Sequence, residues 1–73
     1  MEVSVVGLEC EEAMSVIRGV IRRNNLMPGS QLLVLTQSSS FTTLLKSWAV
    51  SLGHLFELSK SDEFIHLLIT LRG

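Results

Sequence analysis

The chain has 73 residues, of which 47% are hydrophobic and 18% are charged, and its formal net charge is −1. This length predicts one domain, residues 1–73, with a small core that leaves little room for a deep substrate cleft. The balanced charge argues against nucleic-acid binding, which needs a basic face, and the single cysteine excludes a disulfide framework.

The first residues give no signal for export or membrane insertion. Residues 1–6 have no basic region ahead of their apolar stretch and no convincing cleavage site. The longest apolar runs are far too short to span a bilayer. We therefore expect a cytoplasmic protein that does not associate with membranes.

The first predicted elements are a strand and a helix. Val3 and Val5 alternate with polar neighbours, which is typical of a half-buried strand, and Gly7 follows. A helix is predicted next, with acidic residues at its start and arginines at its end, and Pro28-Gly29 lies beyond its end. Its apolar residues recur at the spacing of one helical stripe: Ala13, Met14, Ile17, Val20 and Ile21.

The second predicted strand and helix follow directly. Residues 31–36 are apolar on both faces, as expected for an interior strand. The serines at 38–40 can cap a helix, and Gly53 can end it. The predicted apolar stripe of this helix is Phe41, Leu44, Leu45, Trp48, Ala49 and Leu52.

The last third of the chain predicts a hairpin. Residues 54–59 are assigned to a third strand, 60–63 to a turn and 64–71 to a fourth strand. The order β-α-β-α-β-β predicts an α+β fold, a two-layer sandwich of a mixed four-stranded sheet and two helices on one face. The first two strands should be parallel and the last two antiparallel. The fourth strand should bury one face: Ile65, Leu67, Ile69 and Leu71.

Cys10 is the candidate catalytic residue. It lies between the first strand and the first helix, at or beside the position that caps the helix. A thiol there faces unpaired backbone amides, which favour the nucleophilic thiolate. The alternative is a small hydrophobic residue without a chemical role, because free cysteines often pack in this way.

The order of several motifs resembles the TusA/SirA-like family of small sulfur carriers. Those motifs are Gly7-Leu8-Glu9-Cys10, an amphipathic helix, Pro28-Gly29 before an apolar strand, and Gly53-His54 after the second helix. The resemblance implies a two-layer sandwich similar to the C-terminal domain of translation initiation factor three. It also implies that Cys10 accepts persulfide sulfur from a cysteine desulfurase or rhodanese-like donor. Cys10 would then relay the sulfur to an acceptor protein, for tRNA thiolation, cofactor assembly or sulfur metabolism, with no cofactor of its own.

The residues after Cys10 differ from the family pattern. The family signature Cys-Pro-x-Pro is replaced by Cys10-Glu11-Glu12-Ala13, so both prolines are absent. The two carboxylates oppose a thiolate by an amount comparable to the support of the helix dipole, about 0.3–1 kcal/mol. A second interpretation is therefore a degenerate relative that keeps the fold and acts as a protein-interaction or regulatory module.

The other candidate residues favour structural roles. The ring of His54 is expected to contact a helix carbonyl, and His66 is expected to lie on the open side of the sheet. Trp48 is expected to pack in the core. Two histidines and one cysteine have no metal-ligand spacing, so no metal site is predicted. The arginines of the first helix are interpreted as a solvated flank: Arg18, Arg22 and Arg23.

The sheet face away from the helices is the predicted partner surface. With both helices on one side, Leu32, Val34 and Leu68 are expected to lie without cover on the other. Apolar patches of this kind often mark protein interfaces. We therefore expect self-association or a stable partner across this face.

Overall fold

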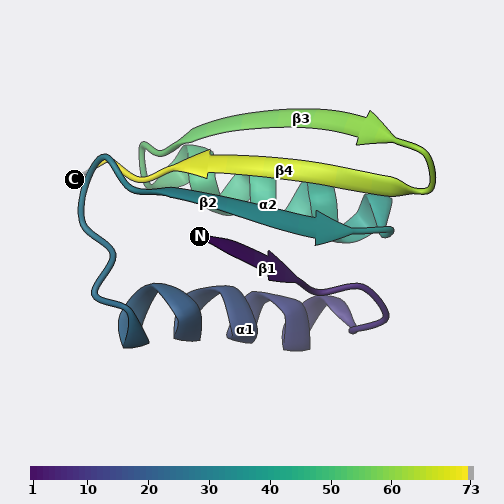
Figure 1. Ribbon diagram of the computed structural model, residues 1–73, viewed down its shortest axis with the longest axis horizontal. Coiled ribbons are helices and arrows are strands. Elements are labelled where there is room, and N and C mark those ends of the chain that lie inside the picture. The colour runs from purple at the N-terminus through teal and green to yellow at the C-terminus, as the bar shows by residue number, and fades with distance from the viewer. Residues whose placement is uncertain (73) are drawn as a thin grey trace.

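The computed structural model describes residues 1–72, which fold into one sheet and two helices. The elements occur in the predicted order (Figure 1). Their bounds are β1 (Glu2–Ser4), α1 (Cys10–Arg23), β2 (Gln31–Thr36), α2 (Ser39–Ser51), β3 (Leu55–Ser61) and β4 (Phe64–Thr70).

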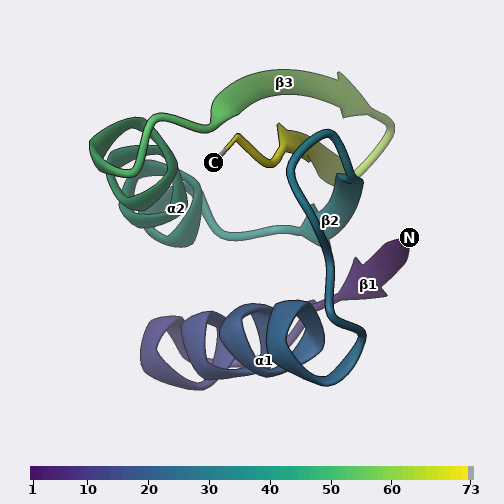
Figure 2. The same cartoon turned by 90° about the vertical axis from the view of Figure 1, so that its left-hand side faces the viewer.

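The four strands form a mixed sheet in the order β1-β2-β4-β3. β1 and β2 are parallel, whereas β4 runs antiparallel to both β2 and β3. Both helices lie on the same side of the sheet (Figure 2). This arrangement confirms the predicted α+β two-layer sandwich.

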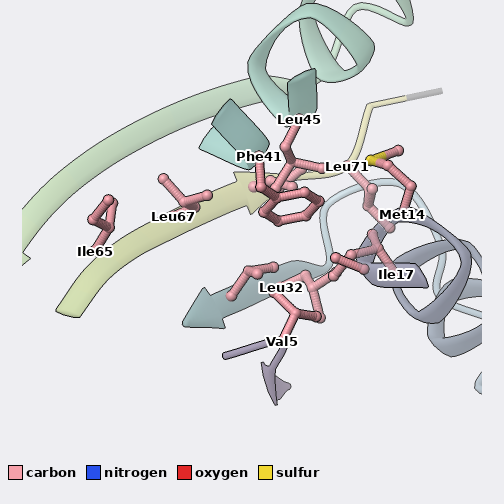
Figure 3. Close-up of a cluster of buried hydrophobic side chains, with 12 residues drawn as sticks. Val5, Met14, Ile17, Leu32, Phe41, Leu45, Ile65, Leu67 and Leu71 are labelled. Atoms are coloured by element: carbon pink, nitrogen blue, oxygen red, sulfur yellow. The ribbon is translucent and has the colours of Figure 1, made fainter. Parts of the chain in front are cut away.

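The core lies between the sheet and the two helices. Alternate residues of β2 and β4 point toward the helices, and the register places Leu32 beside Ile69 and Val34 beside Leu67. Side chains from both layers meet there (Figure 3). The largest fully buried apolar side chains are Phe41, Ile17, Leu32, Leu45, Leu67, Ile69, Val5 and Val34.

The prediction for the two faces of β2 is wrong. Leu32 and Val34 are fully buried under the helices, whereas Leu33 and Leu35 lie on the opposite face and are half-buried. A strand that is apolar on both faces carries no signal for which alternate set points inward. The prediction for Leu68 is confirmed, because this residue pairs with Leu33 on the face away from the helices.

The second helix is capped as predicted but buries a narrower stripe. The Oγ of Ser38 accepts a hydrogen bond from the backbone N–H of Phe41 at 3.0 Å. Gly53 follows the helix with φ +80°, a left-handed conformation that favours glycine. Leu44 and Leu52, predicted in the stripe, are 42% and 54% exposed. The buried residues of α2 are Phe41, Thr42, Leu45 and Ala49, and Trp48 packs against the core while half-buried.

The hairpin turn is shorter than predicted. β3 continues to Ser61, so that only Asp62 and Glu63 connect it to β4. Asp62 adopts φ +57°, a conformation that aspartate tolerates better than most residues. The apolar face predicted for the last strand is confirmed, since all four residues are buried: Ile65, Leu67, Ile69 and Leu71.

Candidate functional site

The start of α1 fixes the position of Cys10. Gly7, in the turn after β1, has φ +84°, and a Cβ added there would meet no atom within 4 Å. Glycine is therefore favoured by backbone conformation rather than by space. Glu9 is extended and caps the helix, so Cys10 is the first helical residue, three positions before the apolar stripe predicted from Ala13.

Backbone hydrogen bonds define the first turn of α1. The N–H of Ala13 donates to the carbonyl of Glu9 at 2.8 Å, and this bond closes the first helical turn. The N–H groups of residues 10–12 have no carbonyl acceptor within the helix. The N–H of Glu9 donates to Oε1 of Glu12 at 3.4 Å, so the Glu12 carboxylate folds back over the helix start.

Cys10 lies between the two environments considered from the sequence. The residue is a free cysteine, is half-buried, and packs against the edge of the hydrophobic core. It is neither sealed in the interior nor fully exposed. Cys10 is therefore partly accessible to solvent, and its side chain packs against the core.

α1 carries acidic side chains at its N-terminal end and basic side chains at its C-terminal end. Glu11 and Glu12 lie in the first turn, and Arg22 and Arg23 in the last. Arg18 is about 12 Å along the helix axis from Cys10, from eight residues at 1.5 Å each. The nearest charged side chains to Cys10 in the helix are therefore acidic, as the sequence indicated.

A groove lies between the two helices, and its lining on α1 begins at Glu11. Its volume is about 740 Å³. Sequence reasoning missed it, because Leu44 and Trp48 were assigned to the core. Both line the groove, and Trp48 also packs against the core. Serines on the facing flanks were the available signal, since small side chains leave space between helices. The lining residues are Glu11, Met14, Ser15, Arg18, Leu44, Ser47, Trp48 and Ser51.

His54 has the predicted structural role with a different partner. The ring was expected to contact a helix carbonyl, but its Nδ1 accepts a hydrogen bond from the backbone N–H of Arg72 at 3.0 Å. The backbone N–H of His54 donates to the carbonyl of Ala49 at 2.9 Å. Its ring lies 5.4 Å from that of Trp48. His54 thus connects the end of α2 to the C-terminal end of β4.

The face of the sheet away from the helices, here called the open sheet face, has an apolar centre. Its half-buried apolar residues include Leu33, Leu35 and Leu68, and His66 lies among them as predicted. A hollow of about 440 Å³ beside Leu33 and Leu68 reaches the N-terminus. Among residues 1–72, no cluster of His, Cys, Asp and Glu could hold a metal ion.

The comparisons with known proteins found no relatives. No family model, no curated protein and no solved structure matches this chain. Within the described residues, neither helix is both long and apolar enough to cross a membrane. The functional interpretation therefore depends on the residues themselves.

Proposed function

We propose that this chain is a small cytoplasmic sulfur carrier that resembles the TusA/SirA-like family. In this role Cys10 accepts persulfide sulfur from a desulfurase or rhodanese-like donor and passes it to an acceptor protein. The observation that carries the proposal is the position of the only cysteine, which is the first residue of α1 and is partly exposed.

The transfer needs no cofactor on this chain. The Cys10 thiolate attacks the terminal sulfur of the donor persulfide, a new S–S bond forms, and the donor S–S bond breaks. The donor cysteine leaves as a thiolate with the electron pair of the broken bond. A nucleophile of the acceptor then attacks the terminal sulfur on Cys10 and releases the Cys10 thiolate. The sulfur moves without net oxidation or reduction.

The surroundings of Cys10 suit a carrier better than an independent enzyme. The donor supplies an activated sulfur, so Cys10 needs only to be reachable and correctly placed. The positive end of the α1 dipole favours an anion at this position, whereas the carboxylates of Glu11 and Glu12 oppose it. A hydrolase or oxidoreductase would need a stronger activating group beside the thiol.

Loading by a sulfur donor tests the proposal. The protein is incubated with a cysteine desulfurase, cysteine and pyridoxal phosphate, and its intact mass is measured. We expect a gain of one sulfur atom that a reducing agent removes. The Cys10→Ser variant should gain none. No gain in the native protein, under conditions that load an established carrier, would contradict the proposal.

The second candidate function is a protein-interaction or regulatory module. The open sheet face favours it, because Leu33, Leu35 and Leu68 form an apolar centre that is only half-buried. This role needs no chemistry at Cys10. Sedimentation of the native protein and of Leu68→Asp tests it: a dimer or complex that the substitution dissociates supports the module, and monomers throughout contradict self-association.

A further inference from the structure

The groove between α1 and α2 extends along two turns of each helix. Its lining residues run from Glu11 to Arg18 on α1 and from Leu44 to Ser51 on α2. Each stretch covers about 10.5 Å of helix axis, or two turns. Both helices run in the same general direction, from right to left in Figure 1. Two adjacent helices present the kind of groove that a third helix can occupy.

The groove combines an apolar floor with charges at separate positions. Met14 is buried, Trp48 is half-buried, and Leu44 is 42% exposed. Methionine adapts to irregular surfaces, and tryptophan often anchors interfaces. Glu11 lies toward the N-terminal end of α1, and Arg18 lies two turns further on. The charge therefore changes sign along the groove.

We propose that this groove binds an amphipathic helix of a partner protein, antiparallel to α1 and α2. The bound helix has a basic residue in its last turn, beside Glu11, and an acidic residue in its first turn, beside Arg18. Its apolar residues at spacings of three and four contact Met14, Leu44 and Trp48.

Two electrostatic features fix this orientation. Helices commonly carry acidic residues at the start and basic residues at the end, because these complement the helix dipole. Only the antiparallel orientation pairs those side chains with Arg18 and Glu11, respectively. It also places the negative, C-terminal end of the bound helix near the positive, N-terminal end of α1. The C-terminal end of the bound helix then lies beside Glu11, in the first turn of α1.

The probe is a pair of synthetic peptides, and Trp48 is the reporter. Each peptide has about 14 residues, a length at which isolated helices become marginally stable. Both peptides carry leucines at i, i+3, i+4 and i+7 and lack tryptophan. The forward peptide has glutamates in the first turn and lysines in the last, and the reversed peptide exchanges them. Trp48 is the only tryptophan, so its emission reports occupation of the groove.

We expect the forward peptide to shift Trp48 emission and to bind at least tenfold more tightly than the reversed peptide. The double variant Glu11→Lys/Arg18→Glu should invert this preference. The matched control, Glu57→Lys/Lys60→Glu, reverses two exposed charges on β3 and should leave the preference unchanged. Circular dichroism checks that each variant is folded.

Three results would overturn the inference. The first is an unchanged Trp48 emission with both peptides at millimolar concentration. The second is a Glu11→Lys/Arg18→Glu protein that still prefers the forward peptide. The third is a control variant that inverts the preference. Because Cys10 is not needed for docking, Cys10→Ser should bind the forward peptide normally, so failure here and failure of sulfur loading are distinguishable.

Discussion

Replacing Leu67 with alanine removes one of the central side chains of the core. Leu67 is 0% exposed and lies on β4 opposite Val34 of β2 and Leu58 of β3. A buried Leu→Ala change costs about 2–5 kcal/mol, from lost burial and the cavity left behind. A domain of 73 residues has a total stability of about 4–11 kcal/mol, at 0.05–0.15 kcal/mol per residue. The substitution should therefore remove a large fraction of the stability.

The neighbouring residue provides the matched control. Leu68 is half-buried on the open sheet face, and Leu68→Ala should cost about 1 kcal/mol or less. Urea unfolding at low protein concentration, followed by far-ultraviolet circular dichroism, measures both changes. We expect Leu67→Ala to lower the unfolding midpoint far more than Leu68→Ala. Equal costs, or a larger cost at Leu68, would refute the register that places Leu67 under the helices.

Four further substitutions test local features. Ser38→Ala should cost about 1 kcal/mol in urea unfolding, because it removes the cap on the N–H of Phe41; an unchanged midpoint would contradict the cap. Gly7→Ala should lower the thermal midpoint, since alanine is strained at φ +84° although space is available; a stabilised variant would count against this account. His54→Ala should speed amide exchange at Arg72, which loses its acceptor; unchanged exchange would show that the hydrogen bond contributes nothing. Glu12→Gln should keep α1 intact by circular dichroism, because the amide oxygen can still accept from Glu9; a loss of helix would show that the charge itself is required.

The sequence was sufficient for the fold because several elements have a clear periodicity and turn residues mark the ends of the others. The predicted stripe of α1 contains all three buried residues of the helix, although Val20 and Ile21 are only half-buried. The alternation in β4 predicts its buried residues correctly. The order of elements and the short hairpin then leave few ways to build one sheet. The failure at β2 has a physical cause: Leu32 and Leu33 are equally apolar, and only pairing with β4 selects the buried set.

The candidate site was predictable in part. Local signals place Cys10 at the start of α1, because a glycine turn precedes an acidic first turn and an apolar stripe. The groove was not predictable in the same way. Whether Trp48 lies in the core or at its edge depends on the distance between two helices, which neither helix encodes alone. Similarly, the partner of His54 is a backbone N–H at position 72, far along the chain.

An isotope chase tests the central claim most directly. The protein is loaded by a desulfurase with cysteine that contains heavy sulfur, and ordinary cysteine is then added in excess. Mass spectrometry of the Cys10 peptide measures the isotope in the persulfide. A carrier predicts a heavy persulfide on Cys10 that exchanges to ordinary sulfur while the desulfurase turns over. A Cys10 peptide that never acquires the extra sulfur, or that keeps the heavy atom throughout the chase, would contradict the account.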